Sequence, residues 1–136
     1  MERQDYLKKQ IDLLGKILGK ILSDLLGLKN SGNINQGLEI TNQTLKAELD
    51  FDIQDLLDIP TDQWIETLIK QKNISNNNLE KLAEILLLIA DNQRDNNKNL
   101  YEKCLTIYQY LETTETVYTL DRQWKITHIK NELSSL

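Results

Sequence analysis

The side chains best suited to chemistry are few and lie far apart in this sequence. His128 is the single histidine, and Glu132 follows it by four positions, so the two side chains share one face if the segment is helical. A zinc site takes three or four protein ligands, and neither a second His nor a group of Cys accompanies this pair. We therefore expect no metal site and interpret His128 as a surface residue.

Cys104 is the only cysteine and the second candidate for reactivity. A nucleophilic thiol needs a nearby base and a positive environment, and the apolar neighbour Leu105 supplies neither. A single cysteine also cannot form an internal disulfide, which suits a reducing compartment. We interpret Cys104 as a buried apolar side chain. The sequence also lacks a glycine-rich phosphate loop, so we predict that the chain is not an enzyme and binds no cofactor.

A run of acidic residues between positions 50 and 62 invites a calcium interpretation, because hard cations bind carboxylate oxygens. The spacing differs from that of an EF-hand loop. Asp55 stands at the sixth position, where that loop needs Gly, and Thr61 at the twelfth, where it needs Glu. We interpret the run as helix caps and an exposed acidic edge that keeps the protein soluble; its members are Asp50, Asp52, Asp55, Asp58 and Asp62.

The net charge of the chain limits which kinds of partner it can bind. The chain carries −5 with a pI near 4.9, whereas nucleic-acid binding needs clustered Lys and Arg to neutralise phosphates. Residues 1–30 are nevertheless basic, with a net charge of +2 against −7 for the remainder. Charged residues open the chain and recur every three or four positions, which matches neither a signal peptide nor a membrane span. We expect a cytoplasmic protein that does not bind nucleic acid.

The composition favours an all-α fold in one domain, residues 1–136. Forty Leu and Ile residues supply a core, whereas one Val, one Pro and five Gly are too few for a β protein. Apolar residues recur at three and four positions, as in amphipathic helices. Asn77 followed by Glu80 resembles a capping box at the start of one helix. We predict about six helices, at residues 2–28, 34–50, 61–72, 78–94, around 101–111 and at 120–134, with a short helical turn before Pro60.

The first helix has an unusually wide apolar stripe. One row of apolar residues alternates by four and three from Leu7 to Leu28. A stripe of this width predicts packing on two sides, against neighbouring helices or against a second copy of the chain. The second row, beside the first, consists of Leu13, Ile17, Leu22 and Leu26.

Two glycines interrupt this helix at a spacing that permits close helix contacts. Gly15 and Gly19 each cost the helix about 1 kcal/mol relative to Ala, so we expect a close packing contact that compensates. The same helix carries the widest apolar stripe, and we therefore predict a homodimer. We assign close helix packing or oligomer contacts to Gly15, Gly19, Leu22 and Leu26.

Two stretches resemble parts of tetratricopeptide repeats, in which helix pairs of about 34 residues pack through small residues at fixed positions. In residues 25–45, Gly37-Leu38 stands where the second helix of the repeat has Ala-Leu. In residues 99–111, Cys104-Leu105 stands at the corresponding place. Gly37 and Cys104 are 67 positions apart, close to two repeat lengths. Residues 60–75 depart from the pattern.

The order of the predicted elements also resembles a family of short, uncharacterised bacterial proteins that place degenerate tetratricopeptide-like helices behind a long N-terminal helix. This resemblance implies a short array or bundle of antiparallel helix pairs. It implies no activity and no site residues.

Trp124 is the residue most informative about binding, because it lies with Leu120 on the side of the last helix opposite Ile126 and Ile129. Either that helix begins after Trp124, or both of its faces are covered, or Trp124 is exposed as an anchor for a partner. In the preceding helix, Tyr110 lies off the core stripe and is free to line a groove. We assign partner binding to Trp124, Leu120, Tyr110 and Tyr108.

These features predict a non-catalytic protein-interaction or scaffold module that presents an apolar groove or helix face to an unidentified protein or peptide. The alternative is a membrane-surface protein that binds through the basic first helix, in which Lys8, Lys9, Lys16 and Lys20 stand opposite Leu and Ile. Against the alternative, the other helices need a partner that covers their apolar faces. Whether the C-terminal helix fills the groove is left open.

Overall fold

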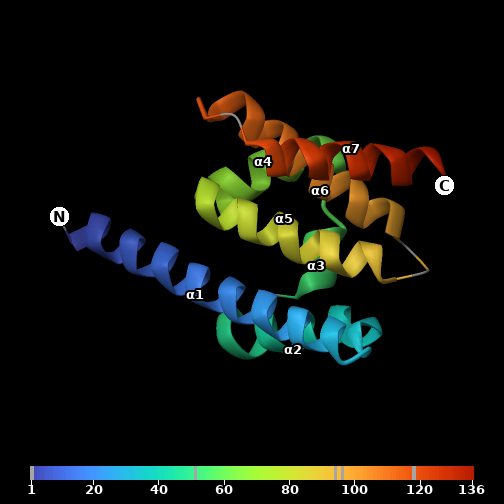
Figure 1. Cartoon of the computed structure of the whole chain (residues 1–136). Helices are drawn as coiled ribbons and strands as arrows, with labels where there is room; N and C mark the ends of the chain where they lie inside the picture. Colours follow the sequence, from blue (N-terminus) through green and yellow to red (C-terminus); the bar gives the residue numbers. More distant parts are fainter. Residues whose placement is uncertain (1, 51, 94, 96, 118) are drawn as a thin grey trace.

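A computed structural model describes residues 2–50, 52–93, 95, 97–117 and 119–136. Within these ranges the chain consists of helices and loops without a strand, so the predicted all-α class is confirmed. Figure 1 shows the helices coloured along the chain. The elements are α1 (Glu2–Asn30), the 3-10 turn η1 (Ile34–Gln36), α2 (Gly37–Leu49), α3 (Ile53–Leu57), α4 (Thr61–Glu66), the π-helical turn η2 (Thr67–Gln71), α5 (Asn76–Asp91), α6 (Asn97–Thr114) and α7 (Leu120–Ser134).

The start of α5 differs from the predicted capping box. The hydroxyl of Ser75 accepts a hydrogen bond from the backbone N–H of Asn78 at 3.3 Å, so Ser75 caps the helix in place of Asn77. The helix begins two residues earlier than expected, and Glu80 is free to contact another helix. The expected end of this helix, Arg94, lies outside the described residues.

Short polar residues end or start several helices. Asp50 ends α2 and Asn73 follows η2, both with positive φ, a conformation that Asp and Asn tolerate better than most residues. Asp52 caps α3, because its carboxylate accepts a hydrogen bond from the backbone N–H of Gln54 at 2.9 Å. That hydrogen bond, with further help from Lys46, lowers the pKa of the Asp52 carboxyl. These two aspartates of the acidic run therefore shape helix ends.

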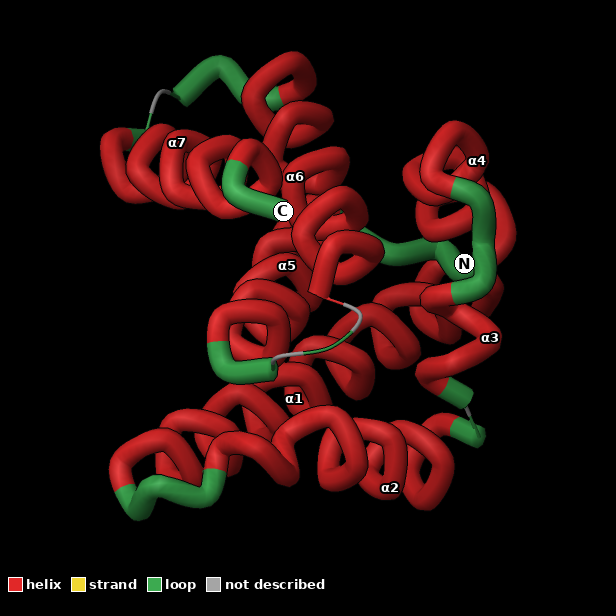
Figure 2. Tube along the Cα trace, turned by 90° about the vertical axis from the view of Figure 1, so that its right-hand side faces the viewer, coloured by secondary structure: helices red, strands yellow, loops and turns green. Residues whose placement is uncertain are grey.

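Helix α5 is the centre of the core. All of its apolar side chains are buried except the half-buried Leu88, and it packs against α1 and α6. Figure 2 shows α5 between α6 and α1. The largest fully buried apolar side chains of the described chain are Trp64, Tyr108, Ile21, Leu25, Leu68, Leu79, Ile85, Leu86, Leu100, Ile107 and Leu111.

Helices α1, α5 and α7 run in the same direction. Along α1 and α5, the carbonyl of Ile11 accepts from the side chain of Asn78 at 3.0 Å, and that of Gly15 accepts from Lys81 at 3.4 Å. Later residues of one helix therefore meet later residues of the other, and the side-chain pairs between α5 and α7 described below follow the same order. In Figure 1, α5 lies between α1 and α7.

The two glycines of α1 have different surroundings. A Cβ atom at Gly15 would lie 3.0 Å from Oδ1 of Asn78 and 3.3 Å from Nζ of Lys81, so α5 approaches α1 closely at this position. At Gly19 nothing described lies within 4 Å of an added Cβ. Nearby Leu22 is half-buried, and Leu26 is 46% exposed. Within one copy, the close contact with α5 accounts for a glycine at position 15. No such contact accounts for the glycine at position 19.

Lys103 is an unexpected member of the core. Lys103 is 1% exposed. Its ammonium group donates to Oδ1 of Asn99 at 3.0 Å and lies 5.3 Å from the centre of the Trp64 ring. Burial lowers the pKa of Lys103.

We expect Lys103→Met to raise the free energy of unfolding at neutral pH by about 1 kcal/mol, because a methionine needs no solvation in this site. The folded wild type releases the Lys103 proton at a lower pH than the unfolded chain does. Its stability therefore gains as pH rises from the folded pKa towards the ordinary lysine value, and the advantage of the variant shrinks. Urea unfolding at neutral and alkaline pH measures the gain in stability of the variant and how this gain changes with pH. An advantage that grows with pH would contradict this account.

Cys104 is fully buried, as expected, and its thiol donates to the carbonyl of Ala83 at 3.1 Å. Burial raises the pKa of this thiol well above its usual value. We expect a disulfide reagent such as dithionitrobenzoate to label Cys104 only as fast as the protein unfolds. Labelling at the rate of a free thiol in the native protein would show that the α5–α6 contact is open.

Candidate functional site

Arg122 fixes the start of α7 to two other segments. Its side chain is 5% exposed, and its Nη2 atom lies 2.6 Å from carboxylate oxygens of both Glu80 and Glu115. Nη1 donates to Glu112 at 3.1 Å. The hydrogen bond to Glu80 is the main reason that the pKa of Arg122 lies above its usual value, with Glu112 and Glu115 adding to it. One guanidinium therefore joins α7 to α5, to α6 and to the residue after α6.

Two further pairs continue the contact along α7. Lys125 lies 3.0 Å from Asp121 and 3.5 Å from Glu84 of α5. Its burial disfavours the charged form, but the hydrogen bond to Asp121 and the charge of Glu84 outweigh it, so the pKa of Lys125 is raised. One turn later, Nε2 of His128 lies 2.7 Å from Oδ1 of Asp91. A basic or aromatic nitrogen of α7 thus meets a carboxylate of α5 at three successive places.

Asp91 also receives a hydrogen bond from the α6 helix. The hydroxyl of Tyr101 donates to Oδ1 of Asp91 at 2.7 Å, the same oxygen that His128 contacts. Burial is the main cause of the raised pKa of Tyr101, and the bond to Asp91 adds to it. The rings of Tyr101 and His128 meet edge to face, with centres 6.4 Å apart. Asp91 therefore links three helices.

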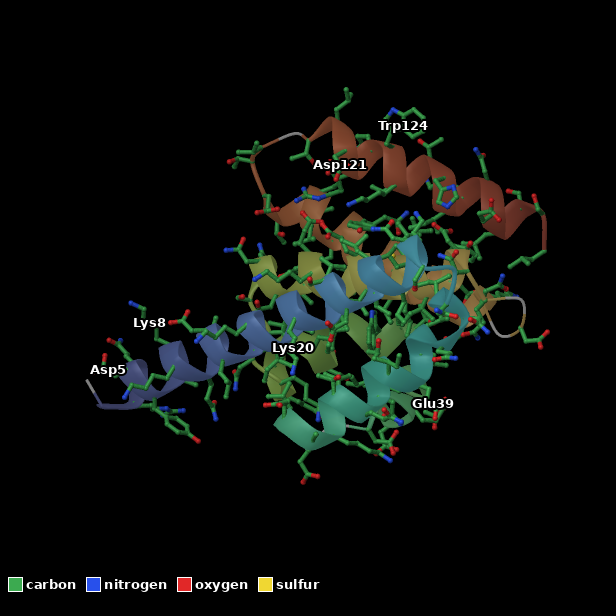
Figure 3. All side chains as sticks on the ribbon, turned by 60° about the horizontal axis from the view of Figure 1, so that its bottom comes forward. Asp5, Lys8, Lys20, Glu39, Asp121 and Trp124 are labelled. Atoms are coloured by element: carbon green, nitrogen blue, oxygen red, sulfur yellow. The ribbon has the colours of Figure 1, made fainter. Side chains whose placement is uncertain are left out.

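The outer side of α7 carries two large apolar side chains that are mostly exposed. Trp124 is 75% exposed and Leu120 is 68% exposed. They border a shallow surface hollow of about 380 Å³, and Figure 3 shows Trp124 pointing away from the helices beneath it. We call the residues that line this hollow the Trp124 patch: Leu120, Gln123, Trp124, Thr127, His128 and Asn131.

Two of the three alternatives for Trp124 do not hold in the structure, which shows the side chain exposed. Helix α7 begins at Leu120, before Trp124, and no described residue covers the outer face, so the side chain is exposed. Val117 is 69% exposed as well, but it lies in the loop before α7 rather than on the helix. The buried side of α7 carries Ile126 and Ile129, as the spacing predicts.

Two of the residues assigned to partner binding lie elsewhere. Tyr108 is fully buried, so its assignment to a partner surface is wrong. It falls on the core stripe of α6, where Lys125 lies 5.8 Å from the centre of its ring, and burial raises its pKa. Tyr110 is half-buried and packs against the core. Neither tyrosine lines the Trp124 patch.

Arg122 is the residue that sequence reasoning missed. It stands on the same side of α7 as Ile126 and Ile129, four and seven positions before them, and a charged residue on an apolar row signals a buried partner. The partners lie up to 42 positions away in the sequence, so no local pattern identifies them.

Two other kinds of site are absent from the described residues. No three His, Cys, Asp or Glu side chains come together there as a metal ion requires. In the same part of the chain, no helix has an apolar stretch of the length needed to cross a bilayer. Comparison with family models, with curated proteins and with solved structures found no match to this chain.

Proposed function

We propose that this protein is a non-catalytic interaction module of the cytoplasm that binds an apolar segment of another protein through the Trp124 patch. The observation that carries the proposal is the exposure of Trp124, at 75%, on a helix whose opposite side is held in place. Tryptophan is among the residues that contribute most to binding at interfaces. An exposed Trp beside an exposed Leu is a surface that gains free energy when a partner covers it.

The attachment of α7 supports this proposal. Arg122, Lys125 and His128 each contact a carboxylate of α5, so the orientation of the helix is set before a partner arrives. Binding to a surface that is already ordered loses less conformational entropy than binding to a mobile one. The three contacts therefore serve to present Trp124 at a fixed place.

The size and charge of the patch indicate a short segment as partner. Two large apolar side chains make a surface of at most a few hundred Å², whereas each side of a stable interface buries about 800 Å². The six patch residues include no Asp, Glu, Lys or Arg. A short apolar peptide or one face of a helix matches this surface better than a large charged one does.

A tetratricopeptide-like arrangement is part of the proposal. Gly37 lies against α1, where an added Cβ would be 2.9 Å from Leu25, and Cys104 is buried against Ala83 of α5. These are the two small residues that stand at the matching positions of the repeat. The shared direction of α1, α5 and α7 is what stacked antiparallel helix pairs require.

The non-catalytic part rests on how Asp91 and His128 are used. This is the pair closest to acid–base machinery, but the same oxygen of Asp91 also binds Tyr101. The pair holds helices together, which is a structural task.

The membrane-surface alternative concerns the basic face of α1. Lys8, Lys9, Lys16 and Lys20 are exposed, as a surface helix needs. The core, however, already buries the apolar side chains from Ile17 to Leu25 that lie on its inner side. Only the first turns of α1 remain for a bilayer. Co-sedimentation with anionic vesicles in low salt would favour this alternative.

Affinity capture from the native cell tests the proposed function. We expect wild type to retain a specific partner that Trp124→Ala loses, while Tyr6→Ala, which removes another exposed aromatic side chain, retains it. With the purified partner, Trp124→Ala should weaken binding by at least about tenfold, the size of a strong interface anchor. Equal binding by wild type and Trp124→Ala would contradict the proposal.

A further inference from the structure

A second apolar hollow lies on the other side of α7 from the Trp124 patch. It has a volume of about 210 Å³ and opens between α1, α5 and α7. Leu22 and Leu26 of α1 and Leu88 of α5 supply apolar surface, and Leu26 is 46% exposed. Glu84 and Asp91 line it with their carboxylates and Lys125 with its ammonium group, so an apolar surface adjoins a net negative charge. We call this the α1–α5 hollow.

The first turns of α1 form a basic arm without a described neighbour. Residues 3–10 are exposed except for the half-buried Leu7, and Figure 1 shows this part of the helix extending beyond the other helices. In Figure 3, the side chain of Lys8 points away from the other helices. An isolated helix of fewer than about 12 residues is marginal in water, so the arm gains from packing against another surface.

The arm and the hollow belong to one row of residues on α1. Successive members lie three or four positions apart, so they share one side of the helix. Lys8 lies 18 positions before Leu26, which is about five turns and returns to the same side. The row consists of Lys8, Ile11, Gly15, Gly19, Leu22 and Leu26.

We propose that a second copy of this chain docks its basic arm, antiparallel, on the α1–α5 hollow, and that the exchange is reciprocal. Antiparallel pairing of two such rows places Lys8 of one copy over Leu26 of the other, beside Asp91 and Glu84. It also places Gly19 of one copy near Gly15 of the other. Nothing described lies within 4 Å of an added Cβ at Gly19, whereas Asn78 and Lys81 of the same copy lie beside Gly15. A twofold axis closes the pair, so no open filament forms.

Charge and area both favour a second copy as the occupant. The arm is basic, and the two carboxylates of the hollow outnumber its one ammonium group, that of Lys125, so the two surfaces are complementary in net charge. From Lys8 to Leu26 the paired row is about 27 Å long, at 1.5 Å per residue. Because each copy contributes both an arm and a hollow, this contact repeats in the pair, and the buried area approaches what a stable dimer needs. The Trp124 patch does not take part.

Sedimentation equilibrium of the full chain at micromolar concentration tests the proposal. We expect a species of twice the 15.8 kDa chain mass that dissociates more readily in high salt. Gly19→Phe should weaken the dimer by at least about tenfold, since the new ring occupies the space of the partner helix. The single copy accommodates this ring, because nothing described lies within 4 Å of a Cβ there. Lys8→Glu should weaken the dimer similarly.

Matched variants control for effects on folding. Gly27→Phe also adds a ring where nothing described lies within 4 Å, and Lys20→Glu reverses a charge about a third of a turn from Lys8; both should change the dimer constant by less than about twofold. Circular dichroism confirms that each variant is folded. Trp124→Ala should leave the dimer intact, so failure of this proposal and failure of the proposed function are distinguishable.

Three results would overturn the proposal. The first is a chain that stays at 15.8 kDa throughout the micromolar range. The second is a dimer that Gly19→Phe and Lys8→Glu leave unchanged, since it would use another surface. The third is a monomer that sediments with anionic vesicles through Lys8, which would assign the arm to a lipid surface.

Discussion

Arg122→Met is expected to lower the free energy of unfolding by about 3 kcal/mol, the lower end of the loss seen when one partner of a buried ion pair is removed. The guanidinium is 5% exposed and contacts three glutamates. Without it, Glu80, Glu112 and Glu115 remain close together with no cation between them. Because these side chains are 21–35% exposed, water solvates them in part, which places the expected loss at the lower end of that range.

Urea unfolding at neutral pH measures this loss. Lys98→Met is the matched control, because Lys98 and Glu102 form an exposed pair at 3.9 Å, and its removal should change stability by less than about 0.5 kcal/mol. Adding Glu115→Gln to Arg122→Met should recover part of the loss by removing one of the three like charges. Equal losses for Arg122→Met and Lys98→Met would show that the cluster does not hold α7.

Trp64→Ala is expected to lower the free energy of unfolding by about 3–5 kcal/mol, the range for removal of a large buried side chain. Trp64 is fully buried, and its indole N–H donates to the carbonyl of Lys103 at 3.1 Å. The substitution leaves a cavity between α4 and α6 and removes the ring beneath the ammonium group of Lys103.

Thermal unfolding provides the measurement, with Trp124→Ala as the control. The two variants remove the same side chain, but Trp124 is 75% exposed, so its removal should change stability by less than about 0.5 kcal/mol. The difference separates a tryptophan that stabilises the fold from one that is available to a partner. Similar losses for both variants would contradict the placement of Trp124 on the surface.

Local periodicity accounts for what the sequence predicts well. The spacing of apolar residues in 82–90 indicates a helix at the centre of the core, and α5 is that helix. In the last helix, the same argument separates Trp124 from Ile126 and Ile129, which lie on the exposed and buried sides. Such patterns act within one helix, so one sequence is enough to see them.

The features that periodicity does not predict depend on contacts between distant segments. Arg122 and Lys103 are charged, and a charged residue is ordinarily expected at the surface, yet their partners come from other turns or other helices. The different surroundings of Gly15 and Gly19 depend on where Asn78 and Lys81 lie. Tyr108 belongs to the core stripe, and its aromatic ring alone suggested a binding role.

Helix α7 is held on its inner side, and we propose that this makes Trp124 available to a partner on the outer side. The polar contacts made between Arg122 and His128 hold the inner side of the helix. The exposed side chains of Leu120 and Trp124 lie on its outer side. Together they support the proposal that this face is a binding surface.

Fluorescence of Trp124 tests this proposal. In the Trp64→Phe variant Trp124 is the only tryptophan, so its emission and its quenching by acrylamide report on this side chain alone. For the free protein we expect emission typical of water and efficient quenching. Binding of the captured partner should shift the emission to shorter wavelength and protect Trp124 from acrylamide. A tryptophan already protected in the free protein, or one whose emission and quenching do not change when the partner binds, would contradict the account.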